Sequence, residues 1–424
     1  MGEETHISRR TQRKAFLKYM GKALVTIVAI ALIMAVFVGK GVLYSLEMSG
    51  LDPLLRWSAF KDPDIRVVEI TDEDYSKFFK ETSPLDRKDL RAVILKIANA
   101  KPKLLVIDLD VTPTKDERDH NVTPLPVQVQ NDVPGTLIIW PQTTARPHLY
   151  GSEIELPLPP AAIPSTHFGV PLFPRERDGM VRAYMRYVPV IYKNRPTSWP
   201  SLAWQAFRGG TASEKPRTEE EEPDLLYFNF GSDRYAFGHT DIESIMQRDN
   251  AELASNLGGK TVILGGNYAA ARDEYFTPAG PMAGVDLVAY AMETEIRGGG
   301  MRELQKIADF FVDILLGSFL AVVGYVIASN WLRIAASVLL GLTLPFIGSY
   351  LVFHSWNLWL SFVPVILGAL VHIGWDIASE RGQEKNEEIE ELKKELKELK
   401  SRAPAKAAEE PSSDSVQPST VAPQ

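Results

Sequence analysis

The chain has 424 residues and a formal net charge of −8, which argues against a nucleic-acid-binding protein because such a protein would show a basic footprint. It contains no cysteine, which excludes disulfides, thiol catalysis and cysteine-ligated zinc. Hydrophobic residues make up 45% of the chain, but they gather in separate runs rather than spreading evenly.

The first apolar run lies within residues 16–38 and is uninterrupted from Ala23 onward. An α-helix needs about 20 apolar residues to cross a bilayer, so we predict a membrane helix over residues 23–46. A cleaved signal peptide is the alternative, but the run is longer than a signal core and no A-x-A motif follows it. The basic residues that predict a cytoplasmic tail over residues 1–22 are Arg9, Arg10, Arg13, Lys14, Lys18 and Lys22.

The middle of the chain, residues 47–306, predicts a single α/β domain. Residues 87–100 carry apolar side chains at the i, i+3, i+4, i+7 spacing of an amphipathic helix. Near-continuous apolar runs joined by such helices are typical of a mostly parallel sheet that is covered on both faces. These runs lie at residues 65–71, 103–111, 135–141 and 260–267.

Three more apolar runs, within residues 308–378, predict three further membrane helices, at residues 310–328, 334–353 and 358–377. With the basic N-terminus in the cytoplasm, four spans return the C-terminus to the cytoplasm and place residues 47–306 outside it. We therefore expect a multi-pass protein of the cytoplasmic (inner) membrane with a periplasmic or extracellular domain. The core of each span lacks charged residues, so a transport function is not favoured.

The last ordered segment is predicted to be a cytoplasmic helix over residues 380–402. Its apolar residues are spaced by three, four and three, which is the a/d pattern of a short coiled coil. They are Ile389, Leu392, Leu396 and Leu399. A solvated helix held by Glu–Lys pairs is the alternative, because the pattern lasts only about two heptads. Residues 403–424 are predicted to be disordered from their composition.

Several stretches carry a resemblance to a known family. In order they are "DPDIRVVEITDEDY", "KLLVIDLD", "HFGVPLFPRERDGMVRAY" and "GGKTVILGGNYAAARDEYFTPAGPMAGVDLVAY". This order resembles the second type of CHASE domain, the cyclase- and histidine-kinase-associated sensory extracellular family, over roughly residues 50–377. The resemblance implies a sensory role, with one membrane span before the domain and three after it. Two features depart from the family: no cytoplasmic catalytic output domain follows, and the acidic "TEEEEPD" is unlike a core element.

Polar residues follow the predicted strands, at the edge of an α/β sheet where ligands tend to bind. They are Asp72, Asp108, Asp110, Gln142, Asn267 and Asp273. Gly265 and Gly266 would let another backbone come close. This set could hold a small polar ligand or a hard cation, although helix caps and turns explain most of these residues without any ligand. We predict no metal and no cofactor.

Catalytic motifs are not found in the sequence. The glycine-rich "LGGKTVILGG" lacks the P-loop order, and the chain has neither G-x-S-x-G nor H-E-x-x-H. We therefore predict that the chain is not an enzyme.

Two functions remain. The first is a membrane-anchored sensor or binding subunit that signals through oligomerisation or through a separate cytoplasmic or membrane partner. The second is an oligomeric membrane scaffold that uses a degenerate sensor domain for assembly. Both imply the lipid bilayer and a homo-oligomer as partners, and neither implies nucleic acid.

Overall fold

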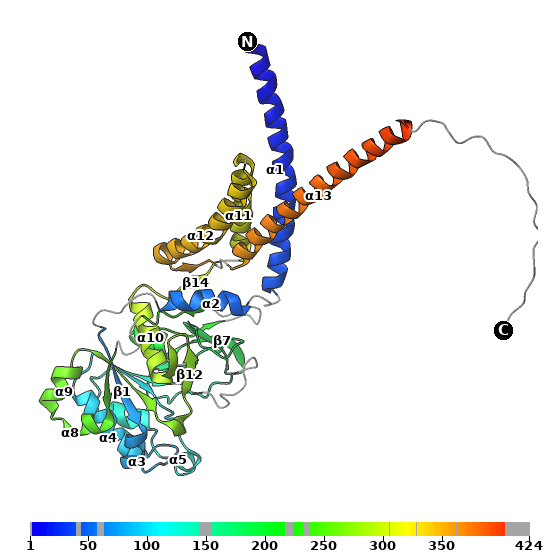
Figure 1. Ribbon diagram of the computed structural model, residues 1–424. Coiled ribbons are helices and arrows are strands. Elements are labelled where there is room, and N and C mark those ends of the chain that lie inside the picture. Colours follow the sequence, from blue (N-terminus) through cyan, green and yellow to red (C-terminus); the bar gives the residue numbers. More distant parts are fainter. Residues whose placement is uncertain are drawn as a thin grey trace, which may run out of the picture.

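The structure is a computed structural model, and it describes residues 2–39, 44–56, 63–143, 154–216, 224–231, 237–304, 306–327, 329–360 and 363–402. An α/β domain lies at one end and a group of long helices at the other (Figure 1). The predicted disordered tail and most of the acidic "TEEEEPD" stretch lie outside the described residues.

A six-stranded sheet forms the centre of the domain, in the order β10-β1-β11-β2-β3-β4, and all of its neighbouring pairs are parallel. Its strands are β1 (Ile65–Thr71), β2 (Leu104–Asp108), β3 (Ile138–Pro141), β4 (Phe168–Gly169), β10 (Gly238–Asp241) and β11 (Thr261–Asn267). The predicted mostly parallel α/β fold is confirmed. The order is not sequential, because β11 lies between β1 and β2.

Both faces of the sheet are buried, as near-continuous apolar strands require. Ile65 and Val67 belong to the core on one face of β1, and Val68 and Ile70 to the core on the other. The first face is covered by α7 (Leu202–Phe207) and α10 (Gly284–Ile296). The second is covered by α3 (Asp72–Lys77), α4 (Arg87–Asn99), α6 (Leu125–Asp132), α8 (Ile242–Gln247) and α9 (Asn250–Leu257).

Smaller elements surround the sheet. The antiparallel pairings join β5 (Ala183–Met185) to β9 (Leu225–Tyr227), β12 (Glu274–Thr277) to β13 (Gly280–Ala283), and β7 (Arg195–Pro200) to both β6 (Tyr187–Tyr192) and β8 (Lys215–Pro216). The remaining short helices of the domain are α5 (Lys115–Asp119), η1 (Ser165–His167) and η2 (Ala269–Ala271).

The long helices are α1 (Gly2–Gly39), α11 (Lys306–Val326), α12 (Asn330–Trp356) and α13 (Val363–Arg402). Among the described residues, Phe16–Ile33 in α1 and Trp331–Phe353 in α12 are long and apolar enough to cross a membrane. Phe310–Val326 in α11 is a shorter apolar stretch. Length and composition therefore support two of the four predicted spans. The predicted boundary near residue 380 does not interrupt α13, which is one continuous helix.

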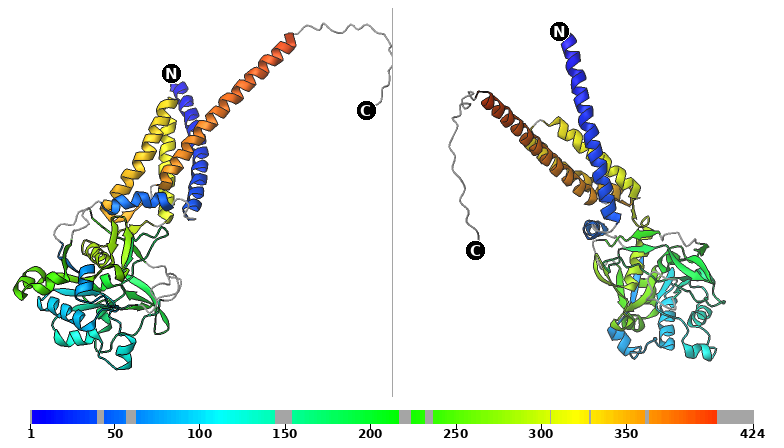
Figure 2. Two further views of the ribbon diagram at one scale, coloured as in Figure 1. Left: turned by 60° about the horizontal axis from the view of Figure 1, so that its bottom comes forward. Right: turned by 90° about the vertical axis from the view of Figure 1, so that its right-hand side faces the viewer.

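A thin layer separates the domain from the long helices (Figure 2). In it, α2 (Tyr44–Leu55) lies across the top of the domain. Helix α1 ends at Gly39 and α2 begins at Tyr44, so the predicted span over residues 23–46 is not one continuous helix. Next to it, β14 (Arg302–Glu303) pairs in parallel with β15 (Leu358–Trp359). This pairing fastens the start of α11 to the link between α12 and α13.

Candidate functional site

The carboxyl ends of the parallel strands meet at one edge of the sheet, which we call the strand-end edge. The helices that follow β1 and β2, α3 and α5, lie at the end of the domain away from the long helices (Figure 1). All six polar residues predicted from the sequence lie at or just beyond these strand ends. Their contacts, however, divide them into separate pairs.

Asp108 and Asp273 form the most closely coupled pair. Burial raises the pKa of Asp108 well above its ordinary value, and the charge of Asp273 raises it further. Burial also raises the pKa of Asp273, although Tyr275 and Arg175 act against it. Two half-buried carboxyls side by side disfavour double ionisation, so this pair can take up a proton that isolated carboxyls would release.

Asp72 and Asn267 lie at the ends of the adjacent strands β1 and β11. Asp72 Oδ1 accepts the backbone N–H of Ala269 at 2.9 Å, and Asn267 Nδ2 donates to Glu69 Oε2 at 2.6 Å. Both side chains are exposed to solvent. They connect the two strand ends through hydrogen bonds, and a ligand at this edge would meet them first.

Asp110 and Gln142 lie further along the edge. Asp110 Oδ1 accepts a hydrogen bond from the backbone N–H of Thr112 at 2.9 Å. This contact stabilises a local turn, which was the alternative to ligand binding for this residue. Gln142 is buried and donates through Nε2 to the carbonyl of Pro157. These two residues therefore have structural partners.

Sequence reasoning missed three residues next to this edge: Glu69, His239 and Asp286. His239 lies between the other two, with Nδ1 3.7 Å from Glu69 Oε2 and Nε2 3.5 Å from Asp286 Oδ1. Burial by itself lowers the pKa of His239, but the contact with Glu69 and the charges of Asp286 and Glu69 outweigh it, so the net pKa is raised. His239 in turn lowers the pKa of Glu69; burial opposes this effect and the Asn267 hydrogen bond adds to it.

We call Glu69, Asp108, His239, Asp273 and Asp286 the strand-end cluster. Four acidic groups and one histidine suit a small polar ligand with a positive charge. Within the ranges described above, no group of three or more histidine or carboxylate side chains is placed to hold a metal ion. An open surface depression lies elsewhere, between α5, α6 and residues 160–162, and its lining includes none of the cluster.

Helix α10 comes unusually close to the sheet at this edge. A Cβ added at Gly265 would lie 2.6 Å from Val285 Cβ, and one added at Gly284 would lie 2.1 Å from Asp273 Oδ2. Gly265 therefore does admit a close approach, as expected, but the neighbour is the first turn of α10 rather than a ligand. Asp286, in that same turn, brings α10 into contact with His239.

The other end of α10 is held by a second set of charges. Glu295, in its last turn, is buried and accepts from both Nε and Nη2 of Arg186 at 2.7 Å. Tyr184 also donates its hydroxyl to Glu295 at 2.8 Å. This end therefore has short, charge-assisted hydrogen bonds.

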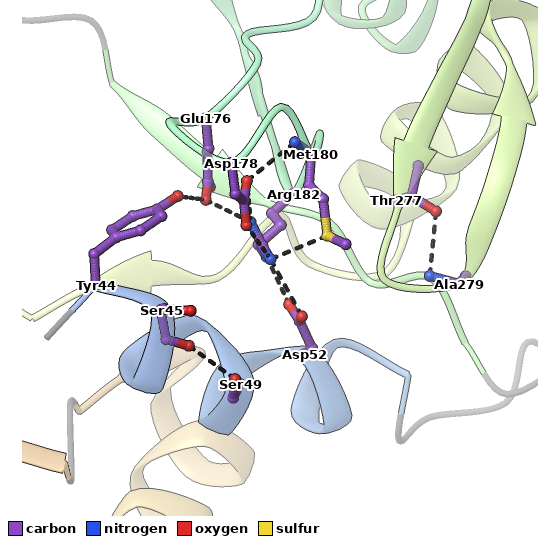
Figure 3. Close-up of polar contacts among 10 residues, drawn as sticks. All are labelled: Tyr44, Ser45, Ser49, Asp52, Glu176, Asp178, Met180, Arg182, Thr277 and Ala279. Atoms are coloured by element: carbon purple, nitrogen blue, oxygen red, sulfur yellow. Dashed lines mark hydrogen bonds and ion pairs between the residues drawn. The ribbon is translucent and has the colours of Figure 1, made fainter.

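A third charged group lies directly against α2 (Figure 3). Arg182 is only 2% exposed and is surrounded by carboxylates: Nε donates to Asp52 Oδ1 at 2.6 Å and Nη1 to Glu176 Oε2 at 2.9 Å. Its Nη2 lies 2.8 Å from Asp178 Oδ2. Tyr44 also donates its hydroxyl to Glu176. We call these five residues the junction cluster, since it joins α2 to the loop before β5.

A sequence signal existed for both clusters. Glu69 lies between Val68 and Ile70, and Arg182 lies between Val181 and Ala183, all four of them fully or nearly fully buried. A charged residue flanked by buried apolar residues needs a partner, because an unpaired buried charge is costly. The partners themselves are remote in sequence: Asp52 is 130 residues from Arg182.

The predicted coiled-coil positions lie on the last part of α13. Ile389, Leu392 and Leu396 are 47%, 56% and 55% exposed. The side chain of Leu399 lies outside the described residues, although its backbone continues the helix. This apolar seam therefore faces solvent within the single chain.

Comparison with known proteins agrees with the architecture. A sequence model of the CHASE2 domain matches residues 25–326, from within α1 to the last residue of α11. Neither the curated proteins nor the solved structures contain a significant match. The matched range covers more than half of the chain and includes the parallel sheet, the strand-end cluster and the junction cluster. The chain therefore belongs to the CHASE2 domain family, a family of extracellular sensory domains.

Proposed function

We propose that this chain is a membrane-anchored sensor subunit whose extracytoplasmic domain passes a ligand-dependent change to its membrane helices. The observation that carries this proposal is helix α10, which contacts the strand-end cluster at its first turn and the Arg186 side chain at its last. The CHASE2 family is sensory rather than catalytic, so we propose no reaction.

The path along α10 is short and stiff. The helix has 13 residues and so spans about 20 Å. Apart from the half-buried Asp286, its residues from Gly284 to Glu295 are buried, so a displacement at one end would be transmitted to the other. Beyond it the chain reaches β14 and then α11. A ligand that moves Asp286 or Asp273 would therefore move the start of α11.

A second path leads to α1 through the junction cluster. Arg182 holds Asp52 of α2, and α2 is the element that follows α1. The pairing of β14 with β15 connects the domain to the link between α12 and α13. Tyr227 also packs against Trp359 in this link, with 5.9 Å between the ring centroids. Movement of the domain would therefore reach all four long helices together.

We further propose that α1, α11, α12 and α13 each cross the membrane, with both termini in the cytoplasm. The end of α1, the start of α11 and the link from α12 to α13 all lie beside the domain (Figure 2). Hence the link from α11 to α12 lies at the opposite end. This alternation and the basic N-terminal tail agree with four spans.

Single cysteines can test the topology, because the chain has none of its own. In intact cells, a membrane-impermeant maleimide should label Ser213→Cys in the domain but not Ser329→Cys, between α11 and α12, or Ser401→Cys at the end of α13. All three should be labelled after the membrane is opened. Labelling of Ser329→Cys in intact cells would contradict the four-span topology.

We propose that the ligand is a small polar molecule held at the strand-end edge by some of Asp72, Asp108, Asp110, Gln142, Asn267 and Asp273. The test is a thermal-unfolding screen of the full chain in nanodiscs against amines, amino acids, sugars and carboxylates. A ligand at a hundred times its dissociation constant stabilises the folded state by about 2.7 kcal/mol. The shift should disappear in Asp273→Asn and persist in Asp132→Asn, which alters a carboxylate that pairs with Arg91 on the surface.

The second candidate is an oligomeric scaffold, and the exposed seam of α13 is the observation that favours it. A scaffold predicts a stable assembly of fixed mass and no stabilisation by any compound in the screen. A sensor predicts at least one stabilising compound whose effect depends on Asp273.

A further inference from the structure

The last part of α13 carries exposed apolar side chains in the part of the chain that the structure describes. It extends past α11 and α12 in every view (Figures 1 and 2). Every side chain described between residues 385 and 398 is exposed. Apolar residues that fall on one stripe of an exposed helix call for a partner, because burying them against another helix is favourable.

The spacing assigns heptad positions along this stripe. With Ile389 at a, Leu392 falls at d, Leu396 at the next a and Leu399 at the next d. The first of these heptads has a β-branched residue at a and leucine at d, the combination that favours two strands over three or four, and the second has leucine at both positions. Further back, the same frame places Ala378 and Gly382 on the stripe and puts Lys385 at the d position just before Ile389, so the apolar stripe begins at Ile389. A Cβ added at Gly382 would meet nothing within 4 Å.

The charges beside the stripe are sorted by sign. The two g positions, 388 and 395, are both glutamate, and the two e positions, 393 and 400, are both lysine. In a parallel pair of helices, each g residue faces the e residue of the next heptad on the other helix. Glu388 would then face Lys393, and Glu395 would face Lys400, so every flanking contact is attractive.

An antiparallel pair would bring like charges together. In that arrangement g faces g and e faces e, which sets glutamate against glutamate and lysine against lysine. The other charges of the segment, such as Glu391, Lys394 and Glu398, fall at outward positions and do not discriminate. The flanking charges therefore specify a parallel orientation, which anchoring in one membrane also imposes.

We propose that α13 binds the same helix of a second copy of this chain, as a parallel, in-register two-stranded coiled coil over residues 389–400. The inference rests on the proposed cytoplasmic position of α13. Two heptads form a weak pair in water, but anchoring in one bilayer raises the effective concentration of the partner helix. The pair gives the proposed sensor a cytoplasmic element that can respond to a change in the domain.

Disulfide trapping in proteoliposomes tests the geometry. Leu392→Cys supplies the only thiol of the chain, at a d position that faces its counterpart; Lys394→Cys supplies one at the outward f position. With a mild oxidant, Leu392→Cys should cross-link at least about ten times faster than Lys394→Cys, because only the d positions meet across a parallel pair. Equal rates would overturn the proposal.

Charge reversal tests the pairing rule. In the Leu392→Cys background, Glu388→Lys with Glu395→Lys should slow cross-linking about tenfold, since four attractive contacts become repulsive. Lys393→Glu with Lys400→Glu should do the same. Mixing the two variants should restore cross-linking, but only between unlike chains. Failure of either variant to slow cross-linking would contradict the parallel, charge-specified pair.

The matched control carries the same change in charge away from the interface. Glu391→Lys with Glu398→Lys falls at outward c positions and should leave cross-linking unchanged. Ligand-induced thermal stabilisation of the domain should persist in the charge-reversed variants. If the charge-reversed variants lose cross-linking but the ligand still stabilises the domain, the coiled coil and the sensor function are shown to be separate. If no ligand stabilises the domain while α13 still pairs, only the scaffold function is left.

Discussion

The strand-end cluster and the junction cluster are both buried sets of charges, yet they are built differently. Arg182 makes charge-assisted contacts of 2.6 to 2.9 Å to three carboxylates. His239 lies 3.5 and 3.7 Å from its two carboxylates, beyond hydrogen-bond length. One set holds its geometry firmly, and the other contains groups whose protonation responds to their surroundings.

The difference matches the two tasks of a sensor. A signal-transmitting joint must not yield, and a buried arginine with several partners resists separation because each carboxylate left unpaired is costly. A recognition site must change state, and groups with shifted pKa values change charge when a neighbour arrives. Helix α10 lies between the two ends of the domain, and three substitutions of decreasing effect test the contrast.

The largest expected effect is at Arg182. Arg182→Met should lower the free energy of unfolding by about 3–5 kcal/mol, because it leaves Asp52, Glu176 and Asp178 without their buried counter-charge. Chemical denaturation of the full chain in detergent or nanodiscs measures the loss. Arg177→Met is the matched control: this exposed arginine of the same loop has its guanidinium carbon 5.9 Å from the centroid of the Tyr44 ring, so its loss should cost about 1 kcal/mol or less. Equal effects would show that the junction cluster is not special.

An intermediate effect is expected at Gly265. Gly265→Ala places a methyl group 2.6 Å from Val285 Cβ and pushes α10 away from the sheet, at a cost of about 1–3 kcal/mol. The same change at Gly135, where an added Cβ meets nothing within 4 Å, should alter stability by less than about 0.5 kcal/mol. If Gly265→Ala were as mild as Gly135→Ala, α10 would not be in firm contact with the strand-end edge.

The smallest expected effect is the pH dependence from His239. Its pKa is raised in the folded state, so its stabilising contribution is fully present below its unfolded pKa of about 6.5 and is lost as pH rises through the folded pKa. His239 should therefore contribute more stability at pH 6 than at pH 8, and His239→Gln should lower the stability at pH 6 relative to pH 8 by about 1 kcal/mol or less. The lowered pKa of Glu69 has the opposite sign, but it acts below its ordinary value of 4.5.

A second histidine gives a control of opposite sign. Burial lowers the pKa of His167, so this residue destabilises the fold as pH falls through its unfolded pKa. His167→Gln should therefore increase the advantage of pH 6 over pH 8. Thermal unfolding of wild type and both variants between pH 6 and pH 8 measures how each substitution changes the pH dependence of stability. Changes of the same sign in the two variants would refute the assignment to His239.

The fold was largely predictable from local pattern. Residues 65–71, 87–100 and 103–111 were expected as strand, helix and strand, and the structure has β1, α4 and β2 within those limits. Such elements can be predicted from nearby residues, because burying one face of a helix or a strand requires apolar residues at a fixed spacing along the sequence. The order of the strands was not predictable, since β11 inserts between β1 and β2 from more than 150 positions away.

The candidate site was predictable only in part. The strand-end rule found Asp108 and Asp273, whose pKa values are raised together, and it also selected Asp110 and Gln142, which have local structural partners. It missed His239 and Asp286, because neither ends a strand of the predicted sheet. The position of Glu69 and Arg182 between apolar residues could have identified both, but not the residues that they contact.

The sequence by itself determined the apolar runs, the α/β character of the domain, the family resemblance and the heptad frame of α13, because each depends on residues near one another in the chain. Tertiary structure alone decided that Arg182 meets Asp52 and that His239 lies between Glu69 and Asp286. Electrostatic energy depends on distance in space, and only the folded sheet with α10 against it brings those charges within reach.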